Sequence, residues 1–230
     1  MYYYYDATYI LVIIGTVIVL AAQGLVRSAF SKYSGIRCSA GLTGAEAARK
    51  ALHDNGVYDV TVQHVPGELT DHFNPASKTV NLSDPVYGSD SIAAVAVAVH
   101  ECGHAMQNNE DYLPLRIRSA IVPAANFGSK LGLPIVIVGL FLSFGPLMFA
   151  GVILFTLGVA FQIVTLPVEF DASRRALEYI EGRGLVNAGE LAGSKKVLRA
   201  AAFTYVASAA AALLSLLRLI LLSRNSRRND

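Results

Sequence analysis

Residues 131–168 read LGLPIVIVGLFLSFGPLMFAGVILFTLGVAFQIVTLPV, a run of 38 residues without one charged side chain. One helix needs only about 20 residues to cross the roughly 30 Å hydrocarbon core of a bilayer, so the run is too long for a single crossing. The sequence Ser143-Phe144-Gly145-Pro146 supplies a turn near its middle. The run therefore predicts a hairpin of two transmembrane helices, at about 126–145 and 146–166.

The composition and two further apolar segments agree with a membrane protein. Hydrophobic residues make up 53% of the chain and charged residues 16%, which is unusual for a soluble domain. The first segment, at about 8–26, follows no lysine or arginine, so we expect a retained helical anchor rather than a signal peptide. The last segment, at 200–222, contains Arg218 and precedes more arginines. It either crosses the membrane or packs at its surface with Arg218 reaching the interface.

Basic residues flank the first helix on its C-terminal side and the hairpin on both sides: Arg27, Lys32, Arg37, Arg116, Arg118, Arg174 and Arg175. Because short cytoplasmic loops are enriched in lysine and arginine, both ends of the hairpin are predicted to be cytoplasmic. We thus expect a multi-pass protein of the cell membrane with the lipid bilayer as a partner. A net charge of +2 without a basic patch gives no indication of nucleic-acid binding, and nothing in the pattern specifies an oligomeric state.

Residues 39–115 have the pattern of a small soluble layer. A short helix is predicted over 43–56, with Thr43 and Glu46 as a capping box. Two short strands follow at 57–65 and 78–83, separated by a loop at 66–77. A helix at 91–109 is apolar on every face before its polar motif, as a buried helix requires. The expected fold is a mostly α membrane protein, one domain over 1–230, with a small cytoplasmic α+β layer.

The buried helix carries the motif His100-Glu101-Cys102-Gly103-His104. Residues four apart lie on one face of a helix, so both imidazoles can reach one ion. Two histidines on an alanine- and valine-rich helix need polar partners, which a zinc ion supplies. We therefore predict a zinc site in which Glu101 is the general base for an attacking water. Cys102 points almost the opposite way and, like Cys38, is expected to be a free thiol.

A third zinc ligand is predicted in the region 167–195, after the hairpin. Pro167 suits a helix start, which would place Glu169 in the first turn. An even number of crossings between the motif and Glu169 returns this region to the side of His100. Helix capping is the alternative role of Glu169. Asp171 is either a rival ligand or a partner that orients a histidine.

Three stretches together resemble the YugP-type neutral zinc metallopeptidases of bacterial membranes: AVAVHECGHAMQ at 96–107, GELTDHFNP at 67–75 and LPVEFDASRRAL at 166–177. The similarity covers nearly the whole chain. More distantly, the chain resembles the HtpX and CAAX prenyl protease type. That resemblance implies a zincin-like, gluzincin-like layer in which His100, His104 and Glu169 bind zinc and Glu101 is the base. The distant relatives have an aspartate four residues after the ligand glutamate, where Ser173 stands here.

Other polar residues have weaker assignments. His53 and His64 have no partner spacing and are expected at the surface. His72 lies in the loop that resembles the family, where it either lines the cleft or serves only the loop. C-terminal to Glu169, three further side chains have two possible roles, which are to stabilise an oxyanion or to anchor the helix at the membrane: Arg174, Arg175 and Tyr179.

The pattern therefore favours a membrane-anchored zinc endopeptidase that hydrolyses protein or peptide substrates, membrane proteins included, at the cytoplasmic membrane surface. The alternative is a non-catalytic membrane scaffold or metal-binding regulator with a structural zinc site. Structural zinc is usually enclosed by four ligands rich in cysteine. Cys38 and Cys102 cannot supply such a set, which favours the enzyme.

Overall fold

The computed structural model describes residues 7–226 and divides them into two compact units. The first, here called the apolar unit, contains residues 7–22, 117–166 and 204–226. The second, the mixed unit, contains residues 23–116 and 167–203. Helices α1 (Tyr9–Ser34), α5 (Leu113–Phe141), α6 (Gly145–Gly182) and α7 (Ala188–Ser226) each contribute residues to both units.

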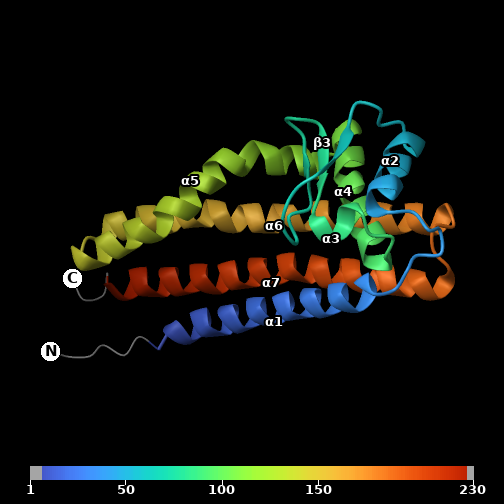
Figure 1. Cartoon of the computed structure of the whole chain (residues 1–230). Helices are drawn as coiled ribbons and strands as arrows, with labels where there is room; N and C mark the ends of the chain where they lie inside the picture. Colours follow the sequence, from blue (N-terminus) through green and yellow to red (C-terminus); the bar gives the residue numbers. More distant parts are fainter. Residues whose placement is uncertain (1–6, 227–230) are drawn as a thin grey trace. The chain divides into compact units, whose positions relative to one another are not determined.

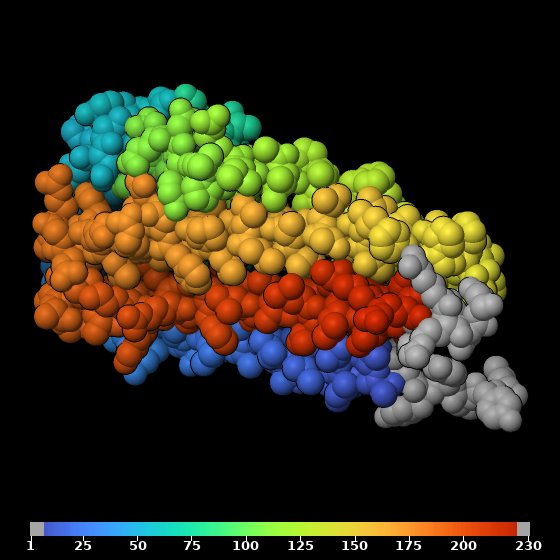
Figure 2. Space-filling view, turned by 180° about the vertical axis from the view of Figure 1, so that it is seen from behind, coloured from blue at the N-terminus to red at the C-terminus, as the bar shows by residue number. Residues whose placement is uncertain are grey.

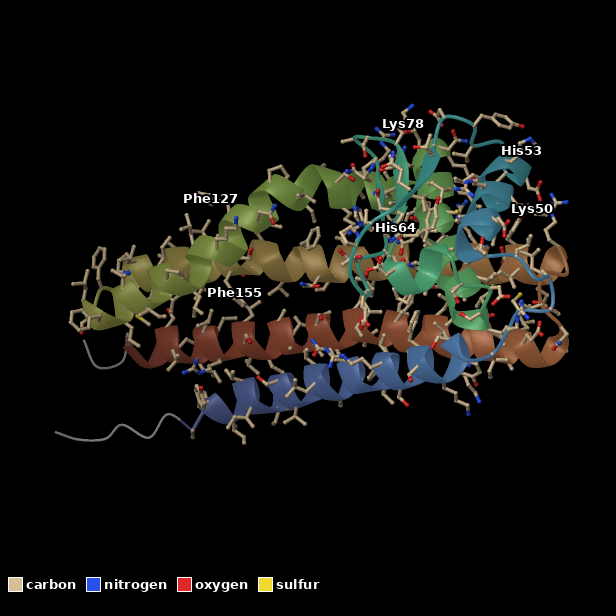
Figure 3. The ribbon with its side chains drawn as sticks, viewed as in Figure 1. Lys50, His53, His64, Lys78, Phe127 and Phe155 are labelled. Atoms are coloured by element: carbon tan, nitrogen blue, oxygen red, sulfur yellow. The ribbon has the colours of Figure 1, made fainter. Side chains whose placement is uncertain are left out.

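The apolar unit consists of segments of these four helices, which lie side by side in the order α5, α6, α7, α1 (Figures 1 and 2). Among the described residues, all four helices are long and apolar enough to cross a membrane. Many large apolar side chains point outward, for example Phe127 of α5, which is 57% exposed (Figure 3). Such a surface is costly in water and suits lipid. The expected mostly helical membrane protein is confirmed at this level.

Small residues bring the helices of the apolar unit close together. A Cβ atom on Gly128 or Gly132 of α5 would collide with the backbone of α6, at 2.2 Å from Leu154 O and 2.7 Å from Phe155 N. Gly15 of α1 packs tightly against α7, where an added Cβ atom would lie 3.1 Å from Ala211 Cα, and the Arg218 guanidinium lies 5.0 Å from the centre of the Tyr9 ring. These two contacts pair α1 and α7 in antiparallel directions. Close approach through small residues is typical of helices that associate in membranes.

The prediction that a helix starts at Pro167 is wrong, because α6 runs without a break from Gly145 to Gly182. A proline interrupts one backbone hydrogen bond inside a helix. Apolar helices of membrane proteins tolerate that loss because neighbouring groups satisfy the freed carbonyl. Glu169 is therefore in the interior of a long helix, not in a first turn.

The mixed unit is built around α4 (Ile92–Asn109), of which 14 of the 18 residues are buried. Helix α2 (Gly44–Asp54) packs across α4 (Figure 1), and its predicted capping box between Thr43 and Glu46 is formed. Ser91 caps α4 by accepting a hydrogen bond from Ala94 N. The short helix α3 (Asp84–Tyr87) also contacts α4.

A small sheet in the mixed unit has the strand order β1-β3-β2. Strand β1 (Thr61–His64) is parallel to β3 (Thr79–Leu82), and β2 (His72–Asn74) is antiparallel to β3. The sequence predicted the first and last of these strands but assigned 72–74 to a loop, so β2 corrects that prediction. Strand β2 lies at an edge of the sheet and contacts α4.

Candidate metal centre

Three side chains of the mixed unit converge on one point. His100 and His104 lie one turn apart on α4, and Glu169 reaches them from α6. Glu169 Oε2 is 3.5 Å from His100 Nε2 and 3.6 Å from His104 Nε2. The potential ligand atoms of the three residues all lie within 4.8 Å of one another. The Glu169 side chain is 3% accessible and the two histidine side chains are 12% and 11% accessible.

The donor set fits zinc. Ligand atoms at about 2.0–2.1 Å from a tetrahedral ion are separated by about 3.4 Å, close to both distances from Glu169. Glu169 Oε2 is buried and accepts no hydrogen bond, so a cation would satisfy it. Both imidazoles turn Nε2 toward Glu169 while Nδ1 has another polar neighbour, Ser173 Oγ at 3.2 Å for His100 and Gln107 Oε1 at 3.1 Å for His104. Zinc-binding histidines are held by such partners.

The second helix comes close to the first because residue 103 is glycine. A Cβ atom there would lie 2.7 Å from Ala172 O and 3.1 Å from Ala172 Cα. Any other residue would push α6 away from α4 at the level of the three clustered side chains. Gly103 thus allows the distance that Glu169 needs.

Glu101 is positioned by the edge strand of the sheet. Its Oε2 atom accepts a hydrogen bond of 3.0 Å from Phe73 N of β2, and the residue is buried at 8% exposure. In the register of β2 and β3, Phe73 stands opposite Val80. One oxygen of the carboxylate is thereby fixed by backbone, which leaves the other free to accept a proton.

Comparison with known proteins shows which family the chain belongs to. A model of the family described as "Putative neutral zinc metallopeptidase" matches residues 8–224. The chain belongs to this family. A relative from Bacillus subtilis (strain 168), named "Putative membrane protease YugP", is 47% identical over 206 residues, which are 90% of this chain and 92% of the relative. The family resemblance stated from the sequence is confirmed, and no solved structure gave a significant match.

Asp171 is not part of the cluster formed by His100, His104 and Glu169. Its Oδ1 accepts a hydrogen bond from Arg174 Nη2 at 2.5 Å, and its Oδ2 accepts from Arg175 Nε at 2.6 Å and from Gln107 Nε2 at 2.9 Å. A carboxylate held by three donors is poorly placed to bind an ion as well. The geometry favours the role of an orienting partner, because Asp171 reaches His104 through Gln107.

The remaining sequence-predicted residues have defined partners. His72 is exposed on β2, with Nδ1 2.8 Å from Thr70 O and Nε2 3.2 Å from Asn81 Nδ2. It is not among the three clustered residues but adjoins Phe73, which bonds Glu101. The Tyr179 hydroxyl donates to Asp54 at 2.9 Å. His53 and His64 are exposed, as expected (Figure 3), and neither is among the three clustered residues.

Cys102 is buried with its Sγ atom donating to Ala48 O at 3.4 Å. Burial raises the pKa of this thiol well above its usual value, so the thiolate that zinc prefers is disfavoured. The prediction that Cys102 packs rather than ligates agrees with these contacts. Burial lowers the pKa of His104, but the adjacent carboxylate of Glu169 outweighs burial and raises this pKa above the usual value.

Sequence reasoning missed three residues that shape the centre: Gly103, Phe73 and Gln107. A glycine inside a buried helix is a detectable signal of close backbone approach. A glutamine three residues after a motif histidine on the same helix is a weaker signal, because i and i+3 residues are neighbours. Phe73 contributes only its backbone N–H, so no side-chain pattern could have revealed it.

Proposed function

We propose that this protein is a membrane-anchored zinc endopeptidase, with His100, His104 and Glu169 as zinc ligands and Glu101 as general base. One observation carries the proposal: two imidazole Nε2 atoms surround a buried carboxylate oxygen that accepts no hydrogen bond, and Glu101 adjoins this group. The family description supports a zinc metallopeptidase, and the name of the relative supports action at a membrane.

The residues divide the chemistry between them. Zinc bound at this centre would polarise the scissile carbonyl and make a water molecule more acidic. Glu101 takes the proton from that water as it attacks, and then delivers it to the leaving amine. The Phe73 N–H holds Oε2 of Glu101, so Oε1 is the atom that carries the proton.

We further propose that the centre works at the cytoplasmic membrane surface on protein segments that reach it. The basic residues that follow the first helix and flank the hairpin support this side of the membrane. Glu169 belongs to α6, one of the four described helices that are long and apolar enough to cross a membrane, which favours membrane proteins and membrane-proximal segments as substrates.

The structural-zinc alternative is less well supported by the donor set. The cluster found among the described side chains has three ligand residues, the number typical of a catalytic zinc with an open position. Cys102 would be the nearest thiol in sequence, but it is turned toward Ala48.

The test separates the two glutamates by zinc content and peptidase activity of purified protein in one detergent. Glu101→Gln should keep zinc but lose activity by about 100- to 10,000-fold, because only proton transfer is removed. Glu169→Gln should bind zinc more weakly and regain part of its activity in excess zinc. Glu181→Gln, an exposed carboxylate of the same helix, is the matched control and should behave like the parent.

Two results would contradict the assignment. If Glu101→Gln retained full activity, the general base would be another group. If Glu169→Gln held zinc as tightly as the parent while Asp171→Asn lost it, Asp171 would be the third ligand.

A further inference from the structure

Gln107 is a fully buried amide, with 0% exposure, three residues after His104. Its Nε2 donates to Val168 O at 2.8 Å and to Asp171 Oδ2 at 2.9 Å. Its Oε1 lies 3.1 Å from His104 Nδ1. Both amide hydrogens and the amide oxygen are therefore engaged, and each bond is costly to lose at this depth.

The direction of this amide is fixed by its surroundings. Val168 O is a carbonyl and Asp171 Oδ2 belongs to a carboxylate, so both neighbours on α6 only accept hydrogen bonds. If the amide were flipped, its oxygen would face two hydrogen-bond acceptors, Val168 O and Asp171 Oδ2, and no hydrogen bond could form. The NH₂ group must therefore face α6, and the oxygen must face the imidazole of His104. A side chain whose orientation is often ambiguous is here determined by its partners.

The amide direction determines where His104 carries its proton. Because Oε1 can only accept, Nδ1 of His104 must be the N–H donor. A neutral imidazole protonated at Nδ1 has its lone pair on Nε2, the atom that lies 3.6 Å from Glu169 Oε2. His100 lacks this constraint, because its neighbour Ser173 Oγ is a hydroxyl that can donate or accept.

Asp171 is the anchor of the arrangement. Arg174 and Arg175 both hold its carboxylate, and Arg175 also pairs with Glu110 at 2.8 Å. An aspartate with two guanidinium partners stays ionised and stationary. It therefore presents a fixed acceptor to Gln107 Nε2.

We propose that Gln107 is a positioning residue which, oriented by Asp171 and the Val168 carbonyl, fixes His104 as its Nδ1–H tautomer so that Nε2 is ready for the ion. The consequence for zinc binding rests on the proposed zinc centre, but the tautomer of His104 is a property of the metal-free protein. Gln107 touches neither the reacting atoms nor the ion. Its effect reaches them only through His104.

The first test measures the tautomer without metal. In ¹⁵N-histidine-labelled, metal-free protein, measured at a pH high enough that the His104 signals no longer change and its imidazole is neutral, Nδ1 of His104 should show a protonated shift and Nε2 an unprotonated one. Gln107→Met keeps the length of the side chain but has no amide, so the two shifts should move toward those of a mixture. Asn108→Ala, which removes an exposed amide at the next position, should leave them unchanged. Unchanged shifts in Gln107→Met would overturn the proposal.

The second test uses zinc affinity, measured by competition with a chromogenic chelator. Gln107→Met should bind zinc about 10- to 100-fold more weakly than the parent. Gln107→Glu should also weaken binding, because its second oxygen opposes Asp171. Adding Asp171→Asn to the Gln107→Glu protein supplies an amide donor to that oxygen, so zinc binding should improve. In the parent, the same Asp171→Asn substitution should weaken zinc binding.

This reversal of sign separates orientation from general stability. If Asp171→Asn weakened zinc binding equally in both proteins, Asp171 would act independently of Gln107 and the proposal would fail. If the parent bound no zinc while the ¹⁵N shifts followed the prediction, the proposed function would fail and the positioning role of Gln107 would stand.

Discussion

Replacing Gly103 with alanine tests whether the distance between α4 and α6 determines zinc binding at the proposed site. The substitution adds one methyl group at the point where the two helices approach most closely within the motif. It changes no ligand, no charge and no hydrogen-bonding side chain. Helix propensity favours alanine over glycine by about 1 kcal/mol, so the change would stabilise α4 if packing were unaffected.

The structure gives the size of the collision. The new Cβ atom would lie 2.7 Å from Ala172 O and 3.2 Å from Ala172 C, whereas ordinary C···O contacts are about 3.3–3.6 Å. Residue 172 of α6 must therefore retreat by about 0.6–0.9 Å. Zinc sites tolerate errors of only about 0.2 Å in ligand distance. Since Glu169 lies one turn from Ala172 on the same helix, its oxygen moves out of that range.

The energetic cost follows from overpacking. Forcing a methyl group into a packed interior costs about 1–3 kcal/mol. If the protein relieves this strain by weakening the bond from Glu169, zinc affinity falls by about 5- to 150-fold, because about 1.4 kcal/mol is a factor of ten. Excess zinc should then restore part of the activity, as in Glu169→Gln.

The assay is chelator competition on Gly103→Ala, with Gly182→Ala as the control. Gly182 lies at the end of α6, and a Cβ atom there would meet nothing within 4 Å. The control should bind zinc like the parent. Parental zinc affinity in Gly103→Ala would refute the claim that close helix packing sets the position of Glu169.

Two further predictions concern stability and topology. Hydrogen bonds from Thr43, Tyr179 and Gly67 lower the pKa values of Glu46, Asp54 and Asp84 respectively. Their stabilisation is complete above the unfolded pKa of about 4 and is lost as pH falls through the lower folded values. The midpoint temperature of thermal unfolding in detergent should therefore decrease as the pH is lowered from about 6 to about 3. An unchanged midpoint temperature would contradict this linkage. Reporters fused after Arg37 and after Arg175, in place of the rest of the chain, should both report the cytoplasm. A reporter fused to the C-terminus should report the outside if α7 crosses the membrane. Opposite sides for the first two would exclude a shared ion.

The sequence predicted those features that depend on residues close together along the chain. The apolar runs, the capping box at Thr43 and the pairing of His100 with His104 each need only local spacing. Strand β2 escaped prediction because three residues are too few to show alternation, and it exists only through pairing with β3. Pro167 misled because a local rule about helix starts does not include the neighbours that tolerate a proline within a long apolar helix.

The candidate centre shows why its remaining parts could not be read from spacing. One short stretch of α6, residues 168–175, supplies the Val168 carbonyl, Glu169, Asp171 and Ser173, and its backbone at Ala172 is the surface against which Gly103 packs. The motif on α4 supplies two of the proposed ligands, but the partners that directly or indirectly orient them, the proposed third ligand and the backbone that sets the distance between the helices all come from this one stretch. A displacement of that stretch therefore acts on all of these contacts together. The motif residues alone specify which atoms can bind zinc, and the packing of α6 against α4 determines whether those atoms meet.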